Sequence, residues 1–269
     1  MSDTFAASGV ITVTTDFGHR GPFVGTMKGV ILNRFADARI VDLTHEVYVH
    51  WPAEAGFWLA RSYHYFPRGS VHMAVVDPGV GTDRNIVLAC GDNHVFLAPD
   101  NGLLAEVVER TAGEMRRVAN EVIEQFAFSD TSATFHGRDV FSPLAAALAS
   151  GQLSVEDCGE ITSDYVPSIV EPPEQRGAQI VGVVMTTDHF GNLITNIEQL
   201  QIEQFRQAVA HVGGHEIPVR RTYGDVDPGD LLALVNSFGV IEIARAEQDA
   251  AAFLGVSRGA PIKITEANI

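Results

Sequence analysis

Short apolar strands alternate with proline-led helices over the first 150 residues, and this order most constrains the fold. Proline in a first helical turn loses nothing, because the N–H that it lacks would be unpaired there anyway. An order of strand, helix, strand predicts a largely parallel sheet in an α/β domain. The predicted strands are residues 10–15, 40–44, 71–76 and 86–90, and the predicted helices are 22–35, 52–66 and about 139–149.

The composition of the chain changes after this half. Residues 164–179 hold three prolines and no periodic apolar face, which is typical of a linker. Short β-rich segments and glycine turns follow, and they predict a smaller all-β domain, either a barrel or a sandwich. We therefore divide the chain into an α/β domain at 1–165, a linker at 166–178 and a barrel-like domain at 179–269. The strands predicted in the last of these are 180–186, 193–197, 231–235 and 239–244.

The bulk numbers describe a globular chain with a substantial core. It has 269 residues, of which 46% are hydrophobic and 19% charged. Cys90 and Cys158 have no disulfide or zinc-site spacing, so we expect buried, unreactive thiols in a reducing compartment. Five aromatic residues of the second predicted helix are assigned to the core, namely Phe57, Trp58, Tyr63, Tyr65 and Phe66.

Charge and hydropathy exclude some classes of protein. The formal net charge of −16 disfavours nucleic acid as a partner, and it fits either a cationic substrate or simple solubility. No apolar run is long enough to cross a bilayer. Asp3 stands where a signal peptide carries basic residues, so we expect a cytoplasmic protein.

Two polar segments follow predicted strands, and in α/β sheets the ligand crevice lies at the carboxyl ends of the strands. Asp16, in the segment Thr14–Gly18, suits a ribose diol, although a capping role is favoured for this motif alone. Asp77 and Arg84 bracket a glycine-rich segment that lacks the GxGxxG and GK[ST] patterns of phosphate loops. An ordinary turn closed by an ion pair competes equally with a functional role there.

His136 immediately precedes the third predicted helix. A helix N-terminus disfavours imidazolium, so the ring there is expected to be neutral and able to accept a proton. The chain has ten histidines, so one such residue is weak evidence. The other histidines lack HExxH or comparable spacing, and no metal site is predicted.

The segment 188–196 brings a carboxylate, an aromatic ring and a side-chain amide into one turn. This set suits an aromatic base that carries a polar group, and a hairpin turn is the competing interpretation. Asn101 and Ser237 lie in similar turn-like segments, each more often structural when taken singly.

Six segments, taken in order, resemble the S-adenosylmethionine hydroxide adenosyltransferases, also called S-adenosylmethionine (SAM) hydrolases. This family is related to the fluorinase and chlorinase enzymes. The segments span nearly the whole chain and read TTDFG, VVDPGVGTDR, PDNG, TFHGRD, DHFGNLITN and NSFGVIEIA. The resemblance implies an α/β N-terminal domain and a β-barrel C-terminal domain that binds adenine. It also implies a homotrimer in which each site lies between the N-terminal domain of one subunit and the C-terminal domain of its neighbour.

The same resemblance implies roles for individual residues. The family's Asp-Arg-His triad maps onto Asp77, Arg84 and His136, which would direct a water-derived nucleophile to C5′ of SAM and release adenosine and methionine. SAM is then the substrate, and no cofactor is implied. Asp16 matches the ribose-binding carboxylate. The other implied substrate-binding residues are Phe17, Asn101, Asp188, Phe190, Asn192, Ser237 and Ala244.

The chemistry of these residues is compatible with that reaction. A sulfonium is already a good leaving group, so the demand falls on positioning a desolvated oxygen nucleophile in line with the C5′–S bond. Arg84 can stabilise developing hydroxide by its charge. His136 with Asp77 can hold or accept the proton, and the choice of base between these two stays open.

Departures from the halide-using relatives favour water as the nucleophile. Those enzymes carry an inserted loop that is missing here, and they place tyrosine with serine or glycine where this chain has His136 and Gly137. The segment after Asp16 lacks the fluorinase's acid and serine, and Phe238 replaces an arginine, so the methionine end is the least constrained. Two alternatives remain, a halide-using SAM adenosyltransferase and a non-catalytic protein that binds adenosine or SAM.

Overall fold

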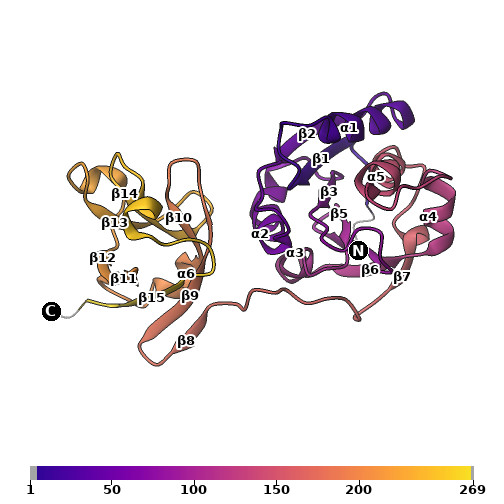
Figure 1. The fold of residues 1–269 in the computed structure, drawn as a ribbon. Helices are drawn as coiled ribbons and strands as arrows, with labels where there is room; N and C mark the ends of the chain where they lie inside the picture. The colour runs from indigo at the N-terminus through magenta and orange to yellow at the C-terminus, as the bar shows by residue number, and fades with distance from the viewer. Residues whose placement is uncertain (1–4, 268–269) are drawn as a thin grey trace. The chain divides into compact units, whose positions relative to one another are not determined.

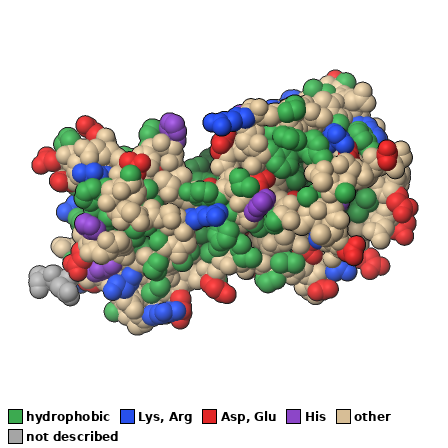
Figure 2. Space-filling view, in the orientation of Figure 1, with side chains coloured by type: hydrophobic (Ala, Val, Ile, Leu, Met, Phe, Trp, Pro, Cys, Tyr) green, Lys and Arg blue, Asp and Glu red, His purple; other side chains and the backbone are tan. Residues whose placement is uncertain are grey.

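The computed structural model describes residues 5–267 of the chain. The chain divides into two compact units, one that ends at Val170 and one that begins at Glu171 (Figure 1). Asp3, on which the prediction about a signal peptide rests, lies outside the described residues. Within the described residues, no helix is both long and apolar enough to cross a membrane. Acidic side chains are spread over the visible surface of each unit (Figure 2).

A seven-stranded sheet forms the centre of the N-terminal unit. Its strand order is β2-β1-β3-β5-β4-β6-β7. The first four strands in this order run parallel, and the last three pair antiparallel. This confirms the largely parallel sheet predicted from the strand and helix order. The strands are β1 (Val10–Thr15), β2 (Arg39–Thr44), β3 (Val71–Val75), β4 (Ile86–Gly91), β5 (His94–Pro99), β6 (Glu114–Val118) and β7 (Gly159–Ile161).

Helices cover both faces of this sheet. Alternate residues of β3 belong to the two hydrophobic clusters on opposite faces. Met73 and Val75 belong to one buried cluster with residues of α1 and α5, whereas Ala74 belongs to a second cluster with residues of α2 and α3. The strand is therefore apolar on both faces, as buried parallel strands are. The helices are α1 (Phe23–Arg34), α2 (Pro52–Ser62), α3 (Ala105–Thr111), α4 (Asn120–Phe126) and α5 (Ser142–Ala149), with shorter turns at Tyr63–Tyr65, Gly137–Phe141 and Glu156–Cys158.

The second helix is shorter than its sequence predicts. The α-helix ends at Ser62, a 3-10 turn follows, and Phe66 is extended with φ −96° and ψ 155°. Phe66 precedes a proline, which disfavours helical backbone at the preceding residue. Tyr65 is consequently 68% exposed, so its assignment to the core is wrong, whereas Phe57 and Tyr63 are buried as expected.

The C-terminal unit is an antiparallel, nearly closed barrel, which confirms the predicted barrel-like fold. Its main strand order is β12-β11-β15-β9-β10-β14-β13, and β8 pairs with β9. An isolated bridge between Val219 and Ala233 joins the two ends of this order. The strands are β8 (Glu174–Arg176), β9 (Gln179–Thr187), β10 (Leu193–Glu198), β11 (Ala208–Val212), β12 (His215–Pro218), β13 (Leu231–Val235), β14 (Val240–Arg245) and β15 (Pro261–Glu266), with helical segments α6 (Gln199–Ile202), α7 (Ala250–Leu254) and a turn at Tyr223–Asp225.

Both cysteines are free, and Cys158 is buried while Cys90 is half-buried. Burial raises the pKa of each thiol to about 12, so neither is a thiolate at neutral pH. The raised pKa agrees with the low reactivity expected for both thiols, although Cys90 is less buried than predicted.

Candidate active site

Arg84 joins Asp77 and His136 in one hydrogen-bonded set. Its Nε donates to both carboxylate oxygens of Asp77, at 2.9 and 3.0 Å. Its Nη2 donates to Asp77 Oδ2 at 2.5 Å and to His136 Nδ1 at 3.0 Å. The structure thus brings together three residues that the sequence singled out separately.

A close backbone approach makes this contact possible. Asp77 follows β3, Arg84 precedes β4, and His136 lies next to the turn Gly137–Phe141. Gly81 between them has φ +78°, and a Cβ there would lie 2.2 Å from the carbonyl oxygen of Ala133. Only glycine fits such a position, so Gly81 lets the loop after β3 lie directly against the segment that leads to His136.

The ion pair between Asp77 and Arg84 is mostly withdrawn from water. Side-chain exposure is 4% for Asp77 and 11% for Arg84. The guanidinium carbon also lies 5.5 Å from the ring centre of Phe141. Since charged pairs interact more strongly away from water, this guanidinium provides a strong, fixed positive charge at the site.

His136 is held as a neutral ring of defined tautomer. A guanidinium can only donate, so Nδ1 must accept, and the ring proton is assigned to Nε2. Burial lowers the pKa of His136, and the charge of Arg84 lowers it further against the opposing effects of Asp77 and Asp139. The expected neutral imidazole is therefore supported, but its Nε2 presents a donor in this arrangement.

The turn that carries His136 has its own charged support. Asp139 is fully buried, accepts from the backbone N–H of Ser132 at 2.9 Å and pairs with Arg138. The hydrogen bond from Arg138 holds the pKa of Asp139 below its usual value. Gly137–Phe141 forms a π-helical turn that continues into α5, and such turns are frequent at functional sites.

Asp16 and Phe17 lie at the same carboxyl edge of the sheet as Asp77. Thr15, the last residue of β1, pairs with Val75 of the parallel strand β3. Asp16 Oδ2 accepts from the backbone N–H of His50 at 2.9 Å. Phe17 packs edge-on against Phe135, beside His136, with ring centres 6.0 Å apart.

Asn101 is bonded to the end of β3. Its Nδ2 donates to the carbonyl of Val76 at 2.8 Å, and its Oδ1 accepts from Leu103 N–H at 3.3 Å. The structure therefore places this predicted substrate-binding residue against the backbone next to Asp77, where it fixes that turn.

In the C-terminal unit, Asp188 organises its own turn. Its Oδ1 accepts the backbone N–H groups of Phe190 and Asn192, both at 2.9 Å, and its Oδ2 accepts Asn192 Nδ2 at 3.0 Å. Phe190 is 75% exposed at the tip of this turn. The turn thus exposes the ring of Phe190 on a backbone that Asp188 holds in place. Asp188 also orients the side-chain amide of Asn192 through its Nδ2.

Ser237 and Ala244 are placed differently from that turn. Ser237 is exposed in the loop between β13 and β14, whereas Ala244 is buried and pairs with Leu232. Ala244 therefore presents almost no surface to a ligand within this unit. Leu193 pairs with Ile243, and Glu198 pairs with Val240, so the turn at Asp188 and the loop of Ser237 lie at opposite ends of the β10–β14 pairing.

A buried carboxyl group near these residues was missed by the sequence analysis. Glu242 is 3% exposed and accepts from Tyr223 Oη at 2.5 Å and from Asn236 Nδ2 at 3.3 Å. Burial raises the pKa of Glu242, and the charge of Asp188 adds to this. The available signal was an acid inside the otherwise apolar run VIEIA.

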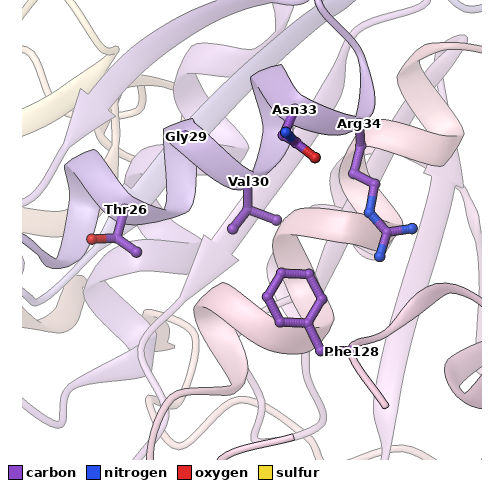
Figure 3. A pocket seen from close by; sticks show the side chains of 6 residues that line it. All are labelled: Thr26, Gly29, Val30, Asn33, Arg34 and Phe128. Carbon is purple, nitrogen blue, oxygen red and sulfur yellow. The ribbon is translucent and has the colours of Figure 1, made fainter. Parts of the chain in front are cut away.

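A cavity of about 340 Å³ lies elsewhere in the N-terminal unit (Figure 3). None of the candidate residues lines it. Its walls are Thr26, Gly29, Val30, Asn33, Arg34 and Phe128. Among residues 5–267, no group of three or more His, Cys, Asp or Glu side chains is arranged to hold a metal ion.

Comparison with known proteins gives the family. Residues 11–159 match the SAM hydroxide adenosyltransferase N-terminal domain, and residues 182–263 match the SAM hydroxide adenosyltransferase C-terminal domain. The chain belongs to the SAM hydroxide adenosyltransferase family. This confirms the resemblance drawn from the six sequence segments.

Relatives within and near the SAM hydroxide adenosyltransferases align over almost the whole chain. An (R)-S-adenosyl-L-methionine hydrolase of Salinispora tropica is 36% identical over 95% of this chain and 97% of its own. That of Thermus thermophilus is 35% identical over 93% and 97%. A fluorinase of Actinoplanes sp. is 26% identical over 96% and 98%. An uncharacterised conserved protein from Thermotoga maritima, of known crystal structure, has a TM-score of 0.86 and 36% identity over 95% of this chain and 100% of its own.

Proposed function

We propose that this protein hydrolyses SAM to adenosine and L-methionine by attack of a water-derived nucleophile on C5′. One observation carries the proposal most directly: Arg84 bridges Asp77 and His136 at the carboxyl edge of the sheet. The family membership and the hydrolase relatives, at 35% and 36% identity, support SAM as the substrate.

The geometry suggests a division of labour within the triad. The buried guanidinium of Arg84 stabilises hydroxide character on the attacking oxygen. His136 orients that oxygen by donating from Nε2, because its Nδ1 is already occupied by Arg84. Asp77 is then the acceptor of the proton that water loses, since it is the anionic member of the set. The C5′–S bond breaks as the C5′–O bond forms, and its electron pair neutralises the sulfonium, which leaves as the methionine thioether.

The binding residues are assigned by the same proposal. Asp16 accepts the ribose hydroxyls, and Phe17 packs beside the triad at that edge. In the barrel, the exposed ring of Phe190 stacks on adenine, and Asn192 reads its polar edge. The other assigned substrate contacts are Asn101, Asp188, Ser237 and Ala244.

We further propose a cytoplasmic homotrimer in which the N-terminal unit of one subunit and the C-terminal unit of its neighbour form each site. The proposal rests on the family resemblance, and the candidate residues lie in both units. Light scattering is expected to give a trimer. A monomer with full activity would overturn this arrangement.

The reaction is tested with purified protein and SAM in water enriched in ¹⁸O. We expect adenosine and methionine in equal amounts, with the label in the 5′-hydroxyl of adenosine. Unlabelled adenosine would contradict direct attack by water. Formation of 5′-halo-5′-deoxyadenosine in the presence of chloride or fluoride would indicate a halide-using transferase instead. Tight adenosine binding without turnover, unchanged in His136→Ala, would indicate a binding protein.

A further inference from the structure

A second chain of polar contacts leads to the turn that carries Asp16. Lys28 Nζ donates to Asp42 Oδ2 at 2.6 Å, and Asp42 Oδ1 lies 3.0 Å from His45 Nε2. His45 Nδ1 in turn lies 2.8 Å from Thr15 Oγ1. The contacts thus run from α1 through β2 to the last residue of β1, directly before Asp16.

Of the two neutral tautomers of His45, only one satisfies this chain. Thr15 Oγ1 already accepts from the backbone N–H of Phe17 at 3.2 Å, so its own proton is free to donate to His45 Nδ1. His45 then carries its proton on Nε2, facing the Asp42 carboxylate. In the opposite tautomer, the unprotonated Nε2 would face the Asp42 carboxylate, and the Thr15 hydroxyl proton would have no acceptor among these contacts. The Nε2–H meets Asp42 Oδ1 obliquely rather than along a straight hydrogen bond.

His45 also holds the Asp16 turn through its backbone. The carbonyl of His45 accepts from Gly18 N–H at 2.8 Å. Five residues later, His50 N–H donates to Asp16 Oδ2 at 2.9 Å, with His50 at φ +60°. A left-handed conformation is uncommon outside glycine and is kept only where the surroundings require it. Segment 45–50 therefore forms hydrogen bonds to the turn at three residues, Thr15, Asp16 and Gly18.

We propose that His45 is a positioning residue that fixes the Asp16 carboxylate for the ribose of the substrate and product. This inference rests on the proposed function only for the identity of the ligand as an adenosine compound. The side chain of His45 is fully buried, and burying an imidazole costs free energy that an apolar residue would not cost. The ring nitrogen of His45 accepts from the Thr15 hydroxyl, and that hydroxyl accepts from Phe17 N–H within the Asp16 turn.

The same sheet supplies a matched control. Thr12, also on β1, bonds through Oγ1 to Nδ1 of the buried His72 at 2.8 Å, the same contact at the same length. That chain continues from His72 Nε2 to His94 Nδ1 at 3.0 Å and does not touch the Asp16 turn. Thr15 Oγ1 has one further bond, from Phe17 N–H, that Thr12 lacks, so the two histidines rather than the two threonines isolate the imidazole contact.

The experiment compares His45→Leu and Thr15→Val with the controls His72→Leu and Thr12→Val in the full-length protein, using KM and kcat for SAM hydrolysis and the Kd for adenosine. His45→Leu removes one hydrogen bond of Thr15 Oγ1, whereas Thr15→Val also removes the bond from Phe17 N–H, and loss of one buried hydrogen bond is worth about a fivefold change in affinity. We expect KM and the adenosine Kd to rise about fivefold in His45→Leu and further in Thr15→Val, with kcat changed less than KM. Thr12→Val should lower the melting temperature comparably and leave both binding constants unchanged. Thr15→Ser keeps the hydroxyl and should restore binding.

A double-mutant cycle then asks whether the effect passes through Asp16. If it does, Asp16→Ala combined with Thr15→Val binds adenosine no more weakly than Asp16→Ala alone. Additive losses, or binding constants changed no more in His45→Leu than in His72→Leu, would overturn the inference. Adenosine binding without turnover in the wild type would overturn the proposed reaction alone, because the cycle can still be read on adenosine. A wild type that binds no adenosine would overturn the ribose assignment and the inference with it.

Discussion

The two units of this chain hold their candidate residues in different ways. In the N-terminal unit, Arg84 and His136 bond across 52 positions of sequence, and the side chains of the Asp77–Arg84 pair are largely buried. In the C-terminal unit, Asp188 bonds to residues two and four positions later, and the ring that it supports is exposed. The first arrangement holds the charge of Arg84 away from water. The second exposes the ring of Phe190 on a turn that is held by its own local hydrogen bonds.

This difference suits the N-terminal set to catalysis and the C-terminal turn to substrate binding. A buried charge keeps its strength and needs no reorganisation during a reaction, as a catalytic group requires. An exposed aromatic ring on a rigid turn contributes area for stacking without perturbing the fold. We therefore expect substitutions in the N-terminal set to lower kcat, and those in the C-terminal turn to raise KM.

Loss of Arg84 should have the largest effect, because it contacts both other members of the triad. Arg84→Met is expected to lower kcat by about 10³, the upper range for removing one electrostatic stabiliser. Arg84→Lys keeps the charge but not the fork that reaches Asp77 and His136 together, so it should recover little. Initial rates of adenosine release measure both variants. A rise in KM with unchanged kcat would place Arg84 in binding and remove the contrast between the units.

His136→Ala should lower kcat by about 10², and the pH profile of the wild type sharpens the assignment. Burial and Arg84 lower the pKa of His136 in the folded protein, so the ring stays neutral further into acid than free imidazole. If the neutral ring is required, the acid limb of kcat/KM, which reports the free enzyme, lies below pH 6.5, the value for an unperturbed histidine. An acid limb above that pH would contradict the neutral assignment.

Phe190→Ala tests the C-terminal side of the comparison. Loss of one stacking ring costs about tenfold in affinity, so KM for SAM should rise about tenfold with kcat little changed. The melting temperature should not move, because the ring is 75% exposed. Phe253→Ala is the control, since it removes another exposed ring, 49% accessible, from the same unit. Equal effects of the two variants on KM would exclude stacking at Phe190.

The last prediction concerns stability in acid rather than activity, and it again separates the units. His72 is buried with its pKa lowered to about 3 by burial, with a further contribution from His94. Between pH 6.5 and pH 3 the unfolded chain therefore takes up a proton that the folded chain refuses. Stability should fall by about 1.4 kcal/mol per pH unit below 6.5 and should be independent of this group above it.

Thermal melts of the wild type and His72→Leu at several pH values check this expectation. The slope of melting temperature against pH below 6.5 should be smaller in the variant. The histidines of the barrel, at positions 189, 211 and 215, are exposed or half-buried, so none shares the burial of His72. An unchanged slope in the variant would remove His72 as the cause.

Local sequence rules predicted much of the fold and failed where tertiary contacts decide. The strand starting at Val10 and the helices starting near Phe23 and Pro52 follow from apolar pattern and proline placement. The strands β5 and β6 were not predicted. The register of β4 against both is a nonlocal pairing that periodicity does not report. Tyr65 was misplaced because Pro67 ends the helix, a local rule that outweighs apolar character.

The sequence by itself determined the residue types, their order in six segments and, through these, the family. Only the tertiary structure decided which of them touch. It placed Arg84 between Asp77 and His136, turned Asn101 onto the backbone beside Asp77, and linked His45 to the Asp16 turn. The physical reason is that hydrogen bonds over such separations depend on how the chain packs. Gly81 passing within contact of Ala133 is one such packing event, and no local pattern of residues encodes its outcome.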